Sequence, residues 1–285
     1  MILVTGGTGQ LGTALASILD RAVYPTRDEL DLARPETVAR AADAYSPSVI
    51  INAGAYTAVD QAEHDEATAW RVNADSVKAL SAYASRQSIP FVTVSTDYVF
   101  DGDTATPYLE SSHPNPLNAY GRSKLAGERA ALTEYGDALV VRTSWVMSST
   151  HNSFLTIAIK AARAGGMRAV TDQRSCPTSA SDLAIGLVAA LEAGATGILH
   201  MANDGDATRY ELALEAARLI GLDSNLIQPA LSTDFPSPVV RPRYSVMRSE
   251  RLASLGLAPL RPWQEALVPL ISALVLGSTP ENSST

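Results

Sequence analysis

The sequence predicts an α/β fold with a doubly wound parallel sheet and a smaller C-terminal lobe. Short apolar strands alternate with helical stretches in the first half, and a glycine-rich turn follows the first strand. The strands also lack the apolar–polar alternation of a sheet with one solvent-exposed face, so helices are expected to cover both faces. Strands that alternate with helices form βαβ units, which place helices on both faces of a parallel sheet.

The first half supplies the expected main sheet. Strands are predicted at residues 2–4, 22–24, 49–51, 90–94 and 139–141. Helices are predicted at residues 11–19, 36–45, 65–86 and 120–135. We expect residues 1–147 to form the first domain, because this regular rhythm ends there.

The second half is less regular and predicts the smaller lobe. Helices are expected at residues 153–164, 181–192, 209–219 and 263–276, a strand at 197–201, and a proline-rich irregular stretch at 229–242. Leu183, Leu187 and Leu191 recur every four residues, which gives their helix an apolar stripe. We expect residues 148–276 to bind substrate mainly and to return some elements to the main sheet. Residues 277–285 are predicted to form a disordered tail.

Charge and composition exclude several classes of protein. The chain has 285 residues, with 22 basic against 30 acidic side chains and a net charge of −8, which disfavours binding to nucleic acid or to an anionic membrane. The lone Cys176 rules out an internal disulfide and suits a reducing compartment. The longest apolar stretch, residues 266–276, is shorter than the roughly 20 residues that span a bilayer, and no leader is visible. These features predict a cytoplasmic protein.

The glycine-rich turn Gly6–Gly12 satisfies the GxGxxG pattern and lies between an expected strand and helix. Glycines allow a tight turn and a close approach of backbone to a pyrophosphate. In this context the pattern predicts that residues 1–147 form a Rossmann-type NAD(P)-binding domain; a turn without a ligand is the alternative. Arg27 follows the second strand, where NAD sites usually place an acidic residue, and favours NADPH through its 2′-phosphate. NADH, with Arg27 a solvated loop residue, stays open.

A tyrosine–lysine pair is the candidate for catalysis. Tyr120 and Lys124 are four residues apart and share one face of the expected helix. A neighbouring cation lowers the pKa of a phenol, which would suit Tyr120 for proton transfer during reduction of a carbonyl. The alternative is an amphipathic helix with an exposed lysine. Ser95 and Thr96 end an expected strand, so one of their hydroxyls is placed to contact the substrate oxygen.

Longer strings carry a resemblance to a known family. They are Gly6–Gly12, Asn52–Asp60, Val94–Gly102, Pro116–Glu128 and Val141–Trp145. With them the chain resembles, over nearly its whole length, the extended short-chain dehydrogenase/reductase superfamily and, within it, the dTDP-4-dehydrorhamnose reductases. The resemblance implies NADPH-dependent reduction of the 4-keto group of dTDP-4-dehydro-L-rhamnose to dTDP-L-rhamnose. Reduction of another dTDP-4-keto-deoxysugar is one alternative. A non-catalytic NADP-binding regulatory subunit is another, although such a subunit could dispense with the tyrosine–lysine pair.

The resemblance also implies roles for individual residues. Tyr120 becomes the proton donor, Lys124 its partner and a ribose ligand, and Thr96 a hydrogen-bond partner of the keto oxygen. The expected substrate-binding residues are Thr96, Asp97, Tyr98 and Trp145. The expected cofactor-binding residues are Gly6, Gly9, Gln10, Leu11, Arg27, Asp31, Leu32, Ala53, Ala55, Tyr56, Thr57, Tyr120 and Lys124.

Several positions depart from related patterns. Related sugar dehydratases place a second carboxylate where Tyr98 follows Asp97, so a plain reductase is expected. Ala14 and Ser181 stand where some relatives have metal-binding glutamates. We therefore expect no metal, and a homodimer is left open. Four histidines lie far apart in sequence, without the spacing of metal ligands. Arg241 and Arg243 either meet a diphosphate or belong to a solvated loop; both readings stay open.

Overall fold

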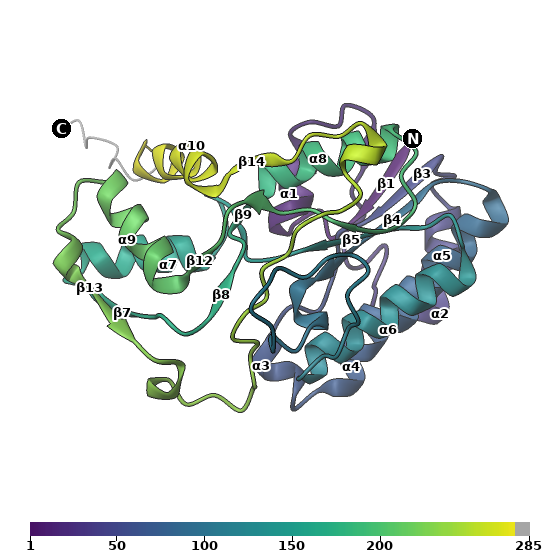
Figure 1. Ribbon diagram of the computed structural model, residues 1–285. Coiled ribbons are helices and arrows are strands. Elements are labelled where there is room, and N and C mark those ends of the chain that lie inside the picture. The colour runs from purple at the N-terminus through teal and green to yellow at the C-terminus, as the bar shows by residue number, and fades with distance from the viewer. Residues whose placement is uncertain (277–285) are drawn as a thin grey trace.

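A six-stranded parallel sheet forms the centre of the protein in the computed structural model, which describes residues 1–276 (Figure 1). Across the sheet the strand order is β2-β1-β3-β4-β5-β10, and every neighbouring pair is parallel. The bounds are β1 (Ile2–Thr5), β2 (Ala22–Val23), β3 (Val49–Asn52), β4 (Phe91–Thr96), β5 (Leu139–Thr143) and β10 (Gly197–His200). The predicted α/β class with a doubly wound parallel sheet is confirmed. The predicted tail at 277–285 lies outside the described residues.

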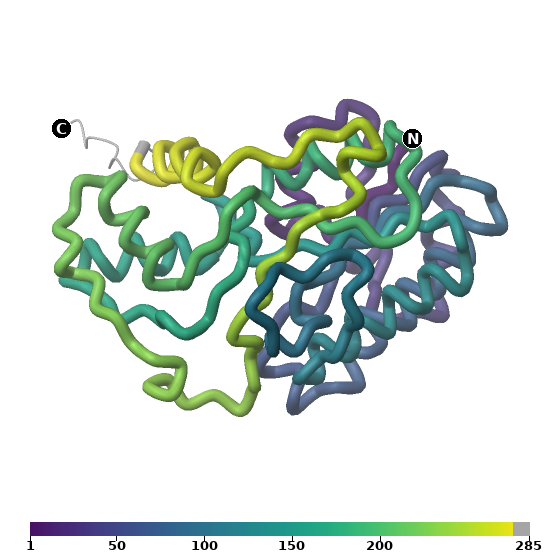
Figure 2. The backbone as a smooth tube through the Cα atoms, viewed as in Figure 1, coloured from purple at the N-terminus to yellow at the C-terminus, as the bar shows by residue number. Residues whose placement is uncertain are grey.

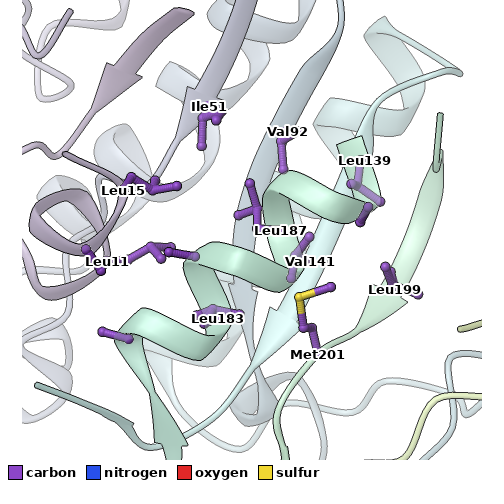
Figure 3. Close-up of a cluster of buried hydrophobic side chains, with 14 of the residues drawn as sticks. Leu11, Leu15, Ile51, Val92, Leu139, Val141, Leu183, Leu187, Leu199 and Met201 are labelled. Atoms are coloured by element: carbon purple, nitrogen blue, oxygen red, sulfur yellow. The ribbon is translucent and has the colours of Figure 1, made fainter. Parts of the chain in front are cut away.

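Helices cover both faces of this sheet. On one face lie α1 (Gln10–Ala16) and α8 (Ala180–Glu192), and on the other lie α2 (Pro35–Asp43), α5 (Ser76–Gln87) and α6 (Ala119–Glu134). Neighbouring strand residues point to opposite faces, so Val141 packs under α8 while Val140 packs toward the α5 and α6 side. Figure 3 shows the first of these cores, where Leu183 and Leu187 of α8 lie over the strands. The predicted apolar stripe is thus confirmed at two leucines, and Leu191 is only partly buried.

Helix α8 and strand β10 come from the second half of the chain but complete the main sheet layer. Strand β10 pairs with β5, with Leu199 opposite Val141. Helix α8 packs beside α1. The division of the chain at residue 147 stays a prediction.

The helix predicted at residues 65–86 is present, but it contains a π-helical turn that the prediction lacked. After the short α3 (Val59–Ala62), the chain forms α4 (Glu66–Trp70), the π-helical turn (Arg71–Asp75) and α5 without a break. The turn packs against Gly127 of α6, where an added Cβ would lie 2.0 Å from the Asn73 carbonyl oxygen. A widened turn and a glycine therefore let two backbones approach closely, and π turns of this kind recur at functional sites.

The second lobe holds α7 (Phe154–Arg163), α9 (Arg209–Leu219) and α10 (Trp263–Leu276), with β7 (Met167–Val170) paired to β13 (Ile227–Ala230). The irregular stretch predicted from residue 229 begins later, because Pro229 and Ala230 belong to β13. Three short strand pairs link the lobes: β6 (Val146–Met147) with β9 (Thr178–Ser179), β8 (Arg174–Ser175) with β12 (Ala207–Thr208), and β11 (Asn203–Asp204) with β14 (Leu260–Pro262). Strands of two or three residues leave no periodic signal in a sequence.

The chain crosses between the lobes again after β13. Figure 2 shows the stretch from residue 231 to 262 leaving the second lobe, running along the sheet domain and returning to α10. Tyr108 anchors it, since its amide donates to Val246 O at 2.8 Å and its carbonyl accepts from the amide of Arg248 at 2.9 Å. Late residues are thereby brought to the ends of the central strands. No helix within residues 1–276 is both long and apolar enough to cross a bilayer.

Candidate active site

A cleft of about 940 Å³ runs along the carboxyl ends of β1, β3, β4 and β5 and reaches the start of α9. Open parallel sheets bind their ligands at this edge, where the strand order reverses. Every residue predicted to bind cofactor, to bind substrate or to act in catalysis lines this cleft. The structure therefore brings together side chains that lie up to about half the chain apart.

The glycine turn forms one wall of the cleft and needs its glycines. Gly6 has a φ of +70°, and a Cβ there would lie 2.5 Å from the Cα of Gly54. A Cβ on Gly12 would lie 2.2 Å from the Gly6 carbonyl oxygen, and the Gly9 amide donates to that same oxygen at 2.9 Å. Gly54 is itself packed tightly, because a Cβ there would meet Leu32 Cδ1 at 2.5 Å. Glycine at position 54 therefore suits the close packing of this turn.

Two buried side-chain oxygens of residues that line the cleft have no partner within residues 1–276. They are Gln10 Oε1 and Thr143 Oγ1, and both residues line the cleft. Because unpaired buried polar atoms are unfavourable, such atoms in a cleft indicate a ligand with polar groups. At the far end, Arg27 Nε lies 3.4 Å from Asp31 Oδ1, and the arginine side chain is 78% exposed. Arg27 is therefore free to turn toward a phosphate group.

Asn73 in the π turn fixes the loop after β3, and sequence reasoning missed it. Its amide group donates to the Tyr56 carbonyl at 3.1 Å and to Ser123 Oγ at 2.9 Å, while its Oδ1 accepts from the Tyr56 amide at 2.9 Å. These bonds tie the expected cofactor loop to the helix that carries Tyr120. An asparagine within an apparently regular helix gives no local signal for this role.

Tyr120 lies in the first turn of α6, which begins where Asn118 accepts a hydrogen bond from the Gly121 amide at 2.8 Å. Burial raises the pKa of Tyr120 well above its ordinary value; Asp97 and Tyr98 raise it further, and a hydrogen bond with Thr96 acts against them. The ring of Tyr98 meets it edge-on, with centroids 5.8 Å apart. The expected lowering of the pKa of Tyr120 by Lys124 is wrong for this structure, because burial dominates. The phenol is held protonated, which is the form that a proton donor requires.

Lys124 is buried four residues further along α6, and its Nζ donates to the Val94 carbonyl at 2.6 Å. Burial lowers the pKa of Lys124 to about 8, and the nearby Glu128 acts against that shift. Glu128 in turn pairs with Arg142 through bonds of 2.8 and 2.6 Å, and both side chains are almost fully buried. A buried ion pair therefore lies directly behind the lysine.

The two hydroxyls that end β4 have different partners. Ser95 Oγ donates to Glu128 Oε1 at 2.5 Å, away from Tyr120. Thr96 Oγ1 donates to Asp97 Oδ1 at 3.1 Å, accepts from the Tyr98 amide at 3.2 Å, and hydrogen-bonds Tyr120. Of the two candidates for contact with a substrate oxygen, the structure favours Thr96.

Asp97 is held by residues that are distant in sequence. Its Oδ2 accepts from Ser175 at 2.9 Å and from Ser245 at 2.5 Å. Burial raises the pKa of Asp97, and these hydroxyl bonds act against that shift. The serines lie 78 and 148 positions away, on β8 and on the returning C-terminal stretch, so no local pattern could have identified them.

Trp145 closes the same end of the cleft in an uncommon backbone conformation, with a φ of +43°. Arg209, at the first position of α9, stacks on its ring, with Cζ 3.6 Å from the ring centroid. Burial lowers the pKa of Arg209 to about 10. Sequence reasoning missed this arginine: Thr208 and Glu211 form a capping box that marks the start of a helix, but a cap says nothing of where the next side chain points.

The remaining candidates from the sequence are two arginines of the returning C-terminal stretch and the histidines. Arg241 bonds Asp60 at 2.8 and 2.9 Å and Ser237 at 2.8 Å, and Arg243 is exposed; neither lines the cleft. His151 lines it and bonds the Thr8 carbonyl through Nε2 at 2.8 Å, which links the second lobe to the glycine turn. In residues 1–276 no group of three histidine, cysteine or acidic residues is placed to hold a metal ion.

A Rossmann-type sheet, a glycine turn after β1 and a tyrosine–lysine pair on α6 together define an extended short-chain dehydrogenase/reductase. The family described as RmlD substrate binding domain matches residues 1–276. The chain belongs to this family.

Relatives with known names support the assignment. The chain is 41% identical over 272 residues, covering 93% of it and 92% of the relative, to a probable dTDP-4,6-dihydroxy-2-methyloxan-3-one 4-ketoreductase from Streptomyces antibioticus. It is 38% identical to a dTDP-4-dehydrorhamnose reductase from Mycobacterium tuberculosis, covering 100% of this chain and 94% of the relative. A crystal structure of dTDP-4-dehydrorhamnose reductase from Bacillus anthracis in complex with NADP superposes with a TM-score of 0.91 at 29% identity, covering 95% of this chain and 98% of that one.

Proposed function

We propose that this protein is an NADPH-dependent nucleotide-sugar 4-ketoreductase that converts dTDP-4-dehydro-L-rhamnose to dTDP-L-rhamnose, with Tyr120 as the proton donor. One observation carries the proposal: the protonated phenol of Tyr120, the Thr96 hydroxyl and Lys124 lie in one cleft with the glycine turn. A keto oxygen bound there would meet a hydroxyl donor, and the residues of the glycine turn would hold the cofactor in the same cleft.

The residues of the cleft fit NADPH. The close-packed glycines leave room for a pyrophosphate at the turn, and Arg27 is free to meet a 2′-phosphate. When bound, NADPH supplies the hydride that reaches the keto carbon. The other expected cofactor residues line the same cleft and would meet the adenosine and ribose of the cofactor; they are Asp31, Leu32, Ala53, Ala55, Tyr56 and Thr57.

Tyr120 then completes the reduction by giving its proton to the oxygen that becomes an alkoxide. Its raised pKa keeps the proton in place until charge develops on that oxygen. Thr96, positioned by its bond to Asp97, is the proposed second hydrogen-bond partner of the same oxygen. Tyr120 becomes a phenolate after the transfer. Lys124, charged below a pH of about 8, supplies the positive charge that stabilises the phenolate.

Asp97, Tyr98 and Trp145 are the proposed contacts of the sugar. Asp97 is fixed by two serine hydroxyls, and Trp145 is fixed by Arg209 and by the Thr178 amide, which donates to its carbonyl at 3.2 Å. Side chains held in this way present one geometry to the substrate, as selectivity requires.

A second substrate has support from the comparisons. The Streptomyces antibioticus relative is named for a different dTDP-linked ketone, so reduction of another dTDP-4-keto-deoxysugar is the alternative. The residues of the second lobe that meet the sugar would decide between them. The intact Thr96, Tyr120 and Lys124 argue against the non-catalytic regulatory role.

The test is NADPH oxidation with dTDP-4-dehydro-L-rhamnose and with other dTDP-4-keto-deoxysugars. We expect turnover by the wild-type protein and a loss of about 100-fold or more in Tyr120→Phe, the lower scale of acid–base catalysis. Tyr135→Phe, at the far end of the same helix, should retain the wild-type rate. Cofactor binding without turnover on any of these sugars would refute the proposal.

A further inference from the structure

An unpaired guanidinium lies in the cleft at the end where the sugar is expected. Arg209 lines the cleft, with its Cζ 3.6 Å from the Trp145 ring centroid and 4.8 Å from that of Phe154. Within residues 1–276 its nitrogens have neither a hydrogen bond nor an ion pair. The guanidinium groups of other partly or fully buried arginines have partners: Arg142 is bonded to Glu128, Arg174 to Glu211, and Arg251 to the Ile198 carbonyl. Arg209 therefore stands apart among them.

Within residues 1–276, none of the charged groups that face Arg209 forms an ion pair with its guanidinium. Asp97 lies close enough to raise the pKa of Arg209, but its oxygens already accept from Ser175, Ser245 and Thr96. Tyr98 also faces it and is neutral, since burial raises the pKa of its phenol. Arg241, which lowers the pKa of Arg209, is itself committed to Asp60. An uncompensated cation in a partly buried site is unfavourable unless a ligand neutralises it.

The aromatic stack leaves the donors of Arg209 available. Stacking uses the face of the guanidinium, whereas its five N–H groups point outward in the plane. Trp145 is itself fixed with a φ of +43°, and residues held in such conformations cluster at ligand sites. The ring therefore holds the guanidinium at the cleft with its hydrogen-bonding edges unused.

The cleft has few other cations to offer an anionic substrate. Among the lysines and arginines that line it within the described residues, Arg27 lies at the adenosine end and Lys124 is bonded to the Val94 carbonyl. A nucleoside-diphosphate sugar carries two phosphates beside its sugar ring. Arginine matches phosphate oxygens with two parallel N–H bonds.

We propose that Arg209 binds the diphosphate of the nucleotide-sugar substrate and, stacked on Trp145, sets the position of the sugar relative to Tyr120. The proposal rests on the proposed function for the class of substrate. It assigns to the start of α9 a binding role in addition to the expected contacts of Asp97, Tyr98 and Trp145.

The test compares binding of dTDP with binding of thymidine, both measured by calorimetry in the presence of NADP⁺. Loss of a charge-assisted hydrogen bond predicts that Arg209→Gln binds dTDP about 10- to 100-fold more weakly, with thymidine and NADPH affinities unchanged. Arg209→Lys keeps the positive charge but lacks the two parallel N–H groups of arginine. Its affinity for dTDP should therefore lie between those of Arg209→Gln and the wild type. Arg218→Gln is the matched control, because Arg218 lies on the same helix, is 66% exposed and pairs with Glu215. It should bind dTDP as the wild type does.

Two results would overturn the proposal: equal affinity of Arg209→Gln and wild type for dTDP, or an equal loss for dTDP and thymidine, which would mean that Arg209 only shapes the pocket. If Arg209→Gln fails to bind NADPH and is misfolded, the comparison rests on Arg209→Lys, which must still lose dTDP affinity selectively.

Failure of the proposed function can be told apart from failure of this inference. A protein that binds dTDP through Arg209 but reduces no keto-sugar refutes the reductase alone, whereas turnover with unchanged dTDP binding in Arg209→Gln refutes this inference alone.

Discussion

Breaking the buried pair of Glu128 and Arg142 should strongly destabilise the fold. Their side chains are 2% and 1% exposed, and the guanidinium reaches the carboxylate through two short bonds. Arg142→Met leaves Glu128 charged and without its partner, with only the Ser95 hydroxyl bonded to it. Within residues 1–276, Lys124 is near Glu128 but makes no hydrogen bond or ion pair with it, so the variant breaks a buried pair, which costs about 3–5 kcal/mol of unfolding free energy.

His200 cannot replace the arginine. Its ring nitrogen lies 3.4 Å from Arg142, but burial lowers the pKa of His200 to about 4, so the ring carries no charge near neutral pH. The double variant Glu128→Gln/Arg142→Met removes both charges and keeps similar volumes. We expect it to be more stable than Arg142→Met by about 1–3 kcal/mol, the size of coupling seen between contacting residues.

Urea unfolding followed by tryptophan fluorescence measures these free energies. Arg218→Met, which removes an exposed pair with Glu215, is the control and should lose less than about 1 kcal/mol. The reasoning fails if Arg142→Met is no more destabilising than this control. It also fails if the double variant is less stable than the single one, because the cost would then lie in packing and not in charge.

Four further outcomes follow from the site. The reductase rate should fall as pH rises through about 8, because Lys124 is charged below that pH and loses its charge above it; Lys124→Met should lower the rate and remove this fall in a pH–rate profile. Glu128→Gln should move the fall to lower pH, since Glu128 raises the pKa of Lys124, and an unmoved profile would refute that coupling. Gly12→Ala should abolish NADPH binding measured by fluorescence, because its Cβ would lie 2.2 Å from the Gly6 oxygen, whereas Gly136→Ala, with open space around it, should bind normally. Arg27→Ala should weaken NADPH more than NADH in the same titration, and equal effects would remove the proposed 2′-phosphate contact.

Local patterns predicted the parts of the site that local geometry determines. The turn Gly6–Gly12 and the pair Tyr120 and Lys124 each depend on spacing within one turn or one helix, and the structure places both in the cleft. Residues 65–86 show the limit of this reasoning. Their composition favours a regular helix, and it gives no sign of the π turn at Arg71–Asp75 that packs closely against Gly127.

The substrate end could not be predicted, because it is assembled by the tertiary fold. Ser175 and Ser245 reach Asp97 from strands and loops that leave no periodic signal, and Arg209 reaches Trp145 only once the fold brings the start of α9 to the residues that follow β5. The resemblance to known reductases supplied Asp97, Tyr98 and Trp145 at this end. It supplied neither the two serines that donate to Asp97 nor Arg209, which stacks on Trp145.

The net charge of −8 explains why the cations Arg209 and Lys124 matter for binding anions and for proton transfer in the cleft. The proposed cofactor and substrate are both anions, and the average field of the protein repels them. Attraction must therefore come from groups within a few ångströms, where low dielectric strengthens each interaction. Burial gives Lys124 and Arg209 that strength and also lowers the pKa of both, so each is favourable only with negative charge beside it. Binding of the dianionic substrate and formation of the Tyr120 phenolate would each supply that charge, which links substrate binding and proton transfer to the same electrostatic cause.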